Sequence, residues 1–148
     1  MEYNAAVTGW GWYCPSKVLS NEDLAKLVDT NDEWIRSRTG IRERRIAGPD
    51  ETTSTMATIA ARQALEEAEL SARDLDLVIC ATTTPDQLLP ATACLIQHNL
   101  GADRAGAFDL NTACTGFLYA LSVGTQFIQG GRRQARPRRR RRNAEPIH

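Results

Sequence analysis

The chain has 148 residues, of which 42% are hydrophobic and 24% are charged, so it is long enough to bury the core of one domain. Its 18 basic and 18 acidic side chains cancel, but residues 1–131 carry 10 basic and 17 acidic groups, whereas residues 132–148 carry 8 arginines and one glutamate. The acidic body excludes a general affinity for nucleic acid.

The four cysteines, Cys14, Cys80, Cys94 and Cys114, are far apart in the sequence. They form no CxxC pair, so we expect no metal site. The first four residues lack the basic start and long apolar core of a secretion signal. We therefore expect a cytoplasmic protein with four free thiols.

Residues 5–13 are rich in strand-forming side chains and end at a Cys-Pro-Ser turn, so we predict a first strand there. Gly9 and Gly11 within it indicate a close approach of another segment. Asn21 is predicted to cap a short helix that runs to about Val28.

Thr30 and Glu33 have the spacing of a capping box, which predicts a helix that runs to Arg38 and is ended by Gly40. Trp34 and Arg38 are four residues apart and so share a face. An exposed indole beside a guanidinium could stack on a purine ring and pair with its phosphates. The residues alone leave a second interpretation open, in which Trp34 is a partly buried core residue with Arg38 lying over it.

The middle of the chain alternates between short strands and helices. We predict a short strand or arm over residues 41–46 and a helix over 54–69, with Arg62 paired to Glu66. Residues 75–82 read as a buried strand.

A loop follows over residues 82–90. Pro90 suits the first turn of a helix that runs to about Asn99. Cys80, in the middle of the preceding strand, is expected to have a packing role.

Cys114 lies between a predicted strand over 105–110 and a predicted helix over 115–129. At such a turn the first amide groups of the helix lack partners, so they can stabilise a thiolate and the oxyanion of acyl transfer. The competing interpretation is that Cys114 packs as a small hydrophobic side chain.

The helix after Cys114 contains no charged residue, and its apolar side chains are distributed around the whole circumference. We therefore predict a helix buried on every side. A membrane span is rejected because the apolar part is shorter than the about 20 residues that a span needs. The alternation of strands and helices predicts an α/β fold with a mainly parallel sheet covered by helices.

Residues 109–121 (DLNTACTGFLYAL) resemble the active-site segment of the β-ketoacyl-acyl-carrier-protein synthase III family, within the thiolase-like superfamily. Residues 28–35 and 38–44 resemble its coenzyme A segment, and the loop over 82–90 also matches. Together the resemblance covers residues 1 to about 131, which predicts the N-terminal half of the thiolase-like fold.

The resemblance implies that Cys114 takes an acyl group from acyl-CoA. It also implies that Thr30, Trp34 and Arg38 line the coenzyme A entrance. Leu89 holds the position of a hydrophobic residue that reaches into the acyl pocket of the partner in a homodimer. Coenzyme A thioester is thus a substrate, and no permanently bound cofactor is expected.

The family starts fatty acid synthesis, because acyl transfer to the cysteine is followed by decarboxylative condensation with malonyl-acyl carrier protein. The condensation uses a His and an Asn from the second half of the fold, and His98 and His148 lack their context. We therefore expect that this chain alone does not condense. The alternatives are a starter-unit polyketide synthase and a non-catalytic fragment that associates with homologues.

Residues 132–148 form an Arg-rich segment that is expected to be disordered and to bind anions nonspecifically. Its abrupt start after residue 131 suggests a shifted reading frame and hence a truncated gene product. Neither a membrane nor nucleic acid is an expected partner.

Overall fold

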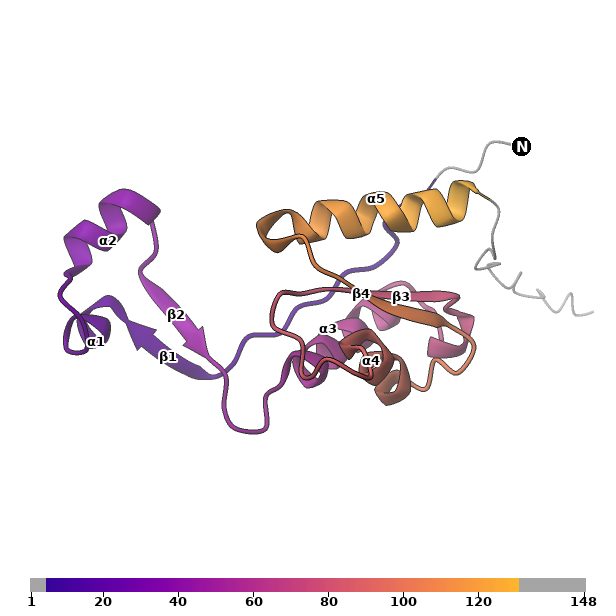
Figure 1. The fold of residues 1–148 in the computed structure, drawn as a ribbon, viewed down its shortest axis with the longest axis horizontal. Coiled ribbons are helices and arrows are strands. Elements are labelled where there is room, and N and C mark those ends of the chain that lie inside the picture. Colours follow the sequence, from indigo (N-terminus) through magenta and orange to yellow (C-terminus); the bar gives the residue numbers. More distant parts are fainter. Residues whose placement is uncertain (1–4, 131–148) are drawn as a thin grey trace, which may run out of the picture.

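The structure is a computed structural model, and it describes residues 5–130. Two parts are evident in Figure 1: a small lobe over residues 17–46 and a body over residues 53–130. The Arg-rich segment and His148 lie outside the described residues. The helices and strands are β1 (Lys17–Ser20), α1 (Asn21–Ala25), α2 (Asp32–Thr39), β2 (Glu43–Ile46), α3 (Thr53–Glu67), η1 (Ala72–Asp74), β3 (Leu77–Ala81), α4 (Thr92–Leu100), β4 (Gly106–Leu110), η2 (Ala113–Thr115) and α5 (Gly116–Gln129).

The body has three layers (Figure 1). Strands β3 and β4 pair in parallel, from Leu77 opposite Gly106 to Ala81 opposite Leu110. Helices α3 and α4 lie on one face of this pair, and α5 lies on the other. The predicted α/β arrangement is confirmed, and Cys80 packs in the core beside Ala93 and Ile96 as expected.

The lobe depends on polar contacts rather than on an apolar core. Its strands β1 and β2 are antiparallel, and Ile35 is the only apolar side chain of residues 17–46 that is buried. Asn21 is 1% exposed and uses its amide fully. Its Nδ2 donates to Asp32 Oδ1 (2.8 Å) and to the Ile41 carbonyl (2.9 Å), and its Oδ1 accepts from Arg44 Nη2 (2.8 Å).

Both helices of the lobe begin at other residues than predicted. Ser20, not Asn21, caps α1 by accepting from the Asp23 amide (3.0 Å), and α1 ends at Ala25 rather than near Val28. The buried amide of Asn21 is occupied by its three long-range partners, so it is not available as a cap.

The predicted capping box at Thr30 is also wrong. Asn31 caps α2, because its Oδ1 accepts from the Trp34 amide (2.8 Å). Asparagine is at least as good an N-cap as threonine, so a helix capped by Asn31 is at least as favourable as one capped by Thr30. Gly40 ends α2 as predicted, with a left-handed φ of 72°.

The predicted strand over residues 5–13 does not form. The segment lies along α3, where a Cβ at Gly11 would fall 2.0 Å from the Ala60 carbonyl oxygen. An apolar groove of about 530 Å³ lies between this segment and the edge of β3 that does not pair with β4. Without a neighbouring strand the backbone makes no ladder, although the close approach predicted from the glycines is confirmed. Trp10 and Trp12, next to Gly11, are each 63% exposed.

Two predictions around α4 are also wrong. Pro90 lies before the helix, which has Ala91 at its N-cap position and begins at Thr92. Arg62 does not pair with Glu66 but donates to the Asn99 carbonyl (2.6 Å). That carbonyl is in the last turn of α4, where carbonyl groups lack helical partners and attract a cation.

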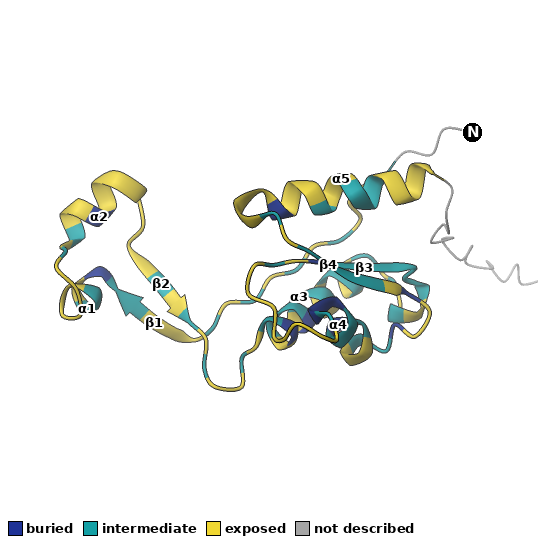
Figure 2. Cartoon of the chain, viewed as in Figure 1, coloured by how far each residue is buried: buried dark blue, intermediate teal, exposed yellow. Residues whose placement is uncertain are grey.

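Helix α5 buries one side only, which corrects the prediction of a helix buried all round. Gly116 is buried at its start, and the Phe127 ring lies 6.3 Å from the Phe108 ring of β4. The opposite side is exposed (Figure 2), since none of the described residues covers it. Among residues 5–130 no helix is long and apolar enough to cross a membrane. The exposed apolar side chains are Phe117, Leu118, Tyr119, Leu121, Phe127 and Ile128.

The contacts of Asn21 give a stability prediction for the lobe. Asn21→Ala should lower the free energy of opening of the lobe by about 2–4 kcal/mol, because it removes three hydrogen bonds and leaves buried partners unsatisfied. Hydrogen exchange of the β1 and β2 amides measures this. Exchange in β3 and β4 should stay unchanged, and Asn99→Ala, at an exposed asparagine, should have no such effect. Equal loss of protection in both variants would contradict the role of Asn21.

Candidate active site

Cys114 lies in the η2 turn that joins β4 to α5, as the sequence predicts, and it is exposed. Since β3 and β4 are parallel, the loop that follows β3 and the turn that follows β4 lie at the same edge of the sheet. In α/β sheets, ligands bind outside this carboxyl edge. The exposure contradicts the interpretation that Cys114 packs as a small hydrophobic side chain.

The backbone around Cys114 is tightly constrained. Ala113 has a φ of +47°, a left-handed conformation that is strained for a residue with a Cβ. A Cβ at Gly116 would lie 3.2 Å from the Cβ of Ala81, so a glycine lets the turn approach the end of β3. No side chain caps η2 or α5, although the Thr115 amide donates to the Thr112 carbonyl (3.2 Å) and the Gly116 amide donates to the Ala113 carbonyl. An amide of this turn that has no such partner can stabilise an oxyanion that forms beside the sulfur.

Cys80 offers the opposite environment. It is 7% exposed, and burial together with the nearby charges of Asp109 and Asp86 raises the pKa of its thiol to about 11. A thiol that stays protonated is a poor nucleophile. Of the two cysteines at this end of the sheet, Cys114 is therefore the one suited to nucleophilic attack.

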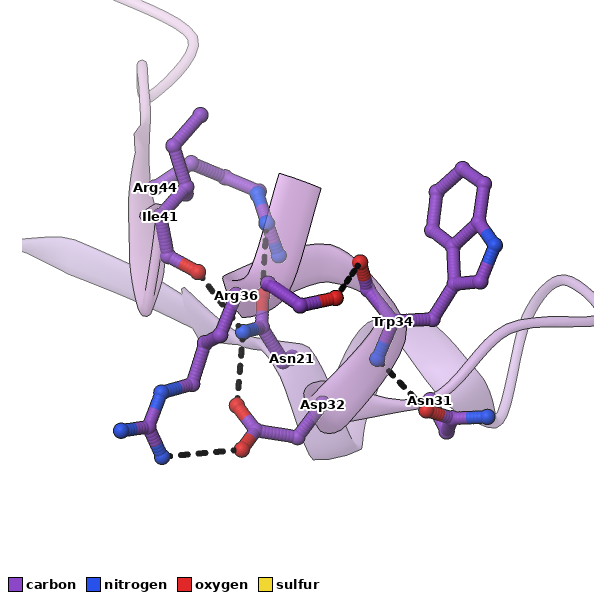
Figure 3. Close-up of polar contacts among 8 residues, drawn as sticks. Asn21, Asn31, Asp32, Trp34, Arg36, Ile41 and Arg44 are labelled. Atoms are coloured by element: carbon purple, nitrogen blue, oxygen red, sulfur yellow. Dashed lines mark hydrogen bonds and ion pairs between the residues drawn. The ribbon is translucent and has the colours of Figure 1, made fainter. Parts of the chain in front are cut away.

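Helix α2 presents Trp34 and Arg38 together (Figure 3 shows Trp34). Trp34 is 53% exposed, and the guanidinium carbon of Arg38 lies 4.9 Å from the centre of its ring. The shared face predicted from their spacing is confirmed, and the exposure is too large for a core tryptophan. Thr30 lies directly before the cap residue Asn31, at the start of the same helix.

Asn21 was predicted only as a helix cap, and its role at the centre of the lobe was not predicted. Figure 3 shows its amide between Asp32, Ile41 and Arg44. Hydrogen bonds from Asn21 and then from Arg36 (3.2 Å) lower the pKa of Asp32, the first residue of α2. The contacts join residues up to 23 positions apart, so no local pattern indicates them.

Leu89 is 80% exposed near the tip of the loop over residues 82–91. The loop is held by Asp86, whose carboxylate accepts from the Ser54 amide and from Thr52 Oγ1, each at 2.9 Å. Burial disfavours the charge of Asp86, but the bonds from Ser54 and Thr52 outweigh it and lower the pKa. The sequence analysis did not single out Asp86, because its partners lie on α3.

The structure does not bring all predicted site residues together. Leu89 and Cys114 belong to the same edge of the sheet, whereas Trp34 and Arg38 lie on the lobe, which is separate from α5 (Figure 1). The end of α5 that carries Cys114 is the end nearer to the lobe. A ligand that touches both places must therefore be long and extended.

Comparisons with known proteins agree with this geometry. The family model of 3-oxoacyl-(acyl-carrier-protein) synthase III matches residues 108–136. β-Ketoacyl-(acyl-carrier-protein) synthase III of Xylella fastidiosa is 59% identical over 127 residues, which cover 86% of this chain and 39% of the relative. The chain thus spans about two fifths of the length of the curated relatives it matches.

Two solved structures are similar to this fold. 3-Oxoacyl-(acyl-carrier-protein) synthase III from Aquifex aeolicus has a TM-score of 0.81 and 55% identity, over 84% of this chain and 40% of that one. The priming β-ketosynthase of the R1128 polyketide pathway has a TM-score of 0.84 and 43% identity, over 88% of this chain and 39% of that one. The resemblance to the synthase III family and the partial thiolase-like fold are confirmed.

The different settings of the cysteines give a prediction on thiol reactivity. At pH 8, iodoacetamide should label Cys14 and Cys114 of the folded chain well before Cys80, because Cys80 is buried and its thiolate forms only near pH 11. Peptide mass spectrometry gives the rate at each site. In urea the four rates should become similar. A Cys80 rate equal to that of Cys14 in the folded chain would contradict its burial.

Proposed function

We propose that this chain is the coenzyme A-binding and acyl-accepting part of a β-ketoacyl-acyl-carrier-protein synthase III, with Cys114 as the nucleophile. The observation that carries the proposal is the exposed Cys114 on a strained turn, at the carboxyl edge of a parallel pair and directly before α5. This setting combines access for a thioester with amide groups that can hold an oxyanion.

In the proposed first half-reaction the Cys114 sulfur attacks the thioester carbonyl of acyl-CoA. The carbonyl electrons move to oxygen, and the tetrahedral oxyanion is stabilised by amides at the start of α5. The oxyanion then collapses, the bond to the coenzyme A sulfur breaks, and the released thiolate takes up the proton that Cys114 lost. The products are an acyl thioester on Cys114 and free coenzyme A.

Trp34, Arg38 and Thr30 form the proposed coenzyme A entrance. The open face of Trp34 would stack on the adenine ring, and the guanidinium of Arg38 would pair with a phosphate, as its fork of donors allows. Thr30 precedes the cap of the same helix and would contact the same end of the ligand. The separation of α2 from Cys114 suits a molecule with a long flexible arm between its nucleotide and its thioester.

The whole enzyme would complete the reaction with malonyl-acyl carrier protein in the cytoplasm and would act as a homodimer in which Leu89 reaches the partner's acyl pocket. The 80% exposure of Leu89 suits such a contact. Priming of polyketide synthesis is a second candidate, favoured by the similarity to the R1128 priming ketosynthase. Both candidates share the first half-reaction and differ in the acyl group.

Acyl transfer to the chain tests the proposal. Incubation with acetyl-CoA should add one acetyl group at Cys114, and Cys114→Ala should abolish the addition. Cys14→Ala, which removes the other exposed thiol, should leave it unchanged. Intact-mass and peptide mass spectrometry locate the acetyl group. A folded chain that binds homologues but is never acylated would favour the non-catalytic fragment.

Nucleotide binding tests the entrance separately. Trp34→Ala and Arg38→Ala should each weaken binding of coenzyme A or adenosine 3′,5′-bisphosphate by about tenfold, because each removes one partner of the stacked and paired ligand. Isothermal titration calorimetry measures the dissociation constants. Trp12→Ala is the matched control, since Trp12 is as exposed but lies outside the lobe. An equal loss in the Trp12 variant would refute the assignment.

A further inference from the structure

We infer that Asp109 is a positioning residue that fixes the loop over residues 82–91, which begins beside the Cys114 turn of the same chain, and that it thereby influences which acyl groups Cys114 accepts. The second part of the inference rests on the proposed function; the first part does not. The Asp109 carboxylate makes no hydrogen bond to Cys114, and it would act through the segments that end at the loop and at the Cys114 turn.

The loop over residues 82–91 is attached to β4 at both ends. At its start, the Thr82 amide donates to the Leu110 carbonyl (3.2 Å), which continues the parallel ladder by one bond. At its end, the Asp109 carboxylate accepts from the Thr92 amide (2.8 Å) and from the Ala93 amide (2.7 Å). Two adjacent residues of β4 thus hold both ends of the loop.

The second attachment is a helix cap supplied from a strand. Helix α4 has Ala91 at its N-cap position, and alanine has no side-chain acceptor. Asp109 provides the missing acceptor, and its negative charge faces the positive end of the helix. Thr92 and Ala93 are both 0% exposed, so water cannot replace these bonds.

The middle of the loop is bonded to α3 instead. Thr53 Oγ1 donates to the Thr84 carbonyl (2.7 Å), and Asp86 binds Ser54. These bonds hold the middle of the loop against α3. The position of the loop ends relative to the Cys114 turn depends on β4, because β4 continues directly into that turn.

Asparagine at position 109 would break one attachment with little change of shape. A carboxylate offers two acceptor oxygens, whereas a carboxamide offers one acceptor and one donor. The donor would face an amide N–H of α4. Asp109→Asn should therefore release the start of α4 and the adjoining loop, while the parallel pairing of β3 and β4 stays intact.

The experiment compares a small and a long alkylating reagent at Cys114. Iodoacetamide and N-octyl iodoacetamide react with the same sulfur, and the ratio of their rates reports the space beside it. The ratio of the two rates at Cys14, an exposed thiol that lies before β1, is the internal reference. In Asp109→Asn the Cys114 ratio should shift by on the order of threefold toward its value in urea, with the Cys14 ratio unchanged.

Asp103→Asn is the matched control, since Asp103 is an exposed aspartate in the connection before β4. A mere loss of stability would move both cysteine ratios together, so only a shift confined to Cys114 supports the inference. A Cys114 shift no larger than in Asp103→Asn would overturn it.

If Asp109→Asn does not fold, hydrogen exchange of the wild-type chain tests the inference instead. The Thr92 and Ala93 amides should then exchange with solvent as slowly as the β4 amides, and exchange at the rate of the loop amides would overturn the inference. Acylation of the wild type by acetyl-CoA is measured in parallel. If the wild type is not acylated, the proposed function is wrong, but the alkylation result on Asp109 remains valid.

Discussion

The parallel pairing of β3 with β4 is the constraint on which the candidate site depends. Parallel strands end at the same edge of a sheet, so the Leu89 loop and the Cys114 turn meet there although 24 residues separate β3 from β4. The same pairing brings Asp109 opposite Cys80 and within reach of α4. The pairing therefore bears both on Cys80, buried in β3, and on Cys114, exposed in the turn after β4.

The lobe and the body are stabilised by different interactions. The body packs helices on both faces of a sheet, with Cys80, Ala93 and Ile96 at its centre. The lobe is too small for such a core, and the buried amide of Asn21 joins its two helices and β2 instead. Hydrogen bonds require defined distances and angles, so a polar centre of this kind fixes the relative orientation of the elements that it joins. Such a centre holds α2 in one orientation relative to α1 and β2.

Some local signals in the sequence predicted local features correctly, although the predicted N-caps of α1 and α2 and the Arg62–Glu66 pair were wrong. Gly40 as a helix end, the shared face of Trp34 and Arg38, and the turn at Cys114 each depend on residues a few positions apart. The side-chain contacts of Asn21, Asp86 and Asp109 join residues 11 to 34 positions apart, and no periodicity indicates them.

Two further predictions failed because they required a partner. Residues 5–13 have the composition of a strand, but a strand needs a neighbour, and a groove lies between this segment and β3. The α5 sequence is apolar all round, yet β3 and β4 can cover only one side of a helix. Apolar composition shows that a segment can be buried, but it does not show whether other residues of the described chain pack against it.

The exposed tryptophans have a consequence for spectroscopy. Trp10, Trp12 and Trp34 are all more than half exposed in the folded chain, so their indoles already have a largely aqueous environment. Intrinsic emission will change little in wavelength when the chain unfolds, and it is a poor monitor of folding here. Emission from Trp34 in α2 therefore overlaps that of Trp10 and Trp12, and replacing these two residues would isolate it.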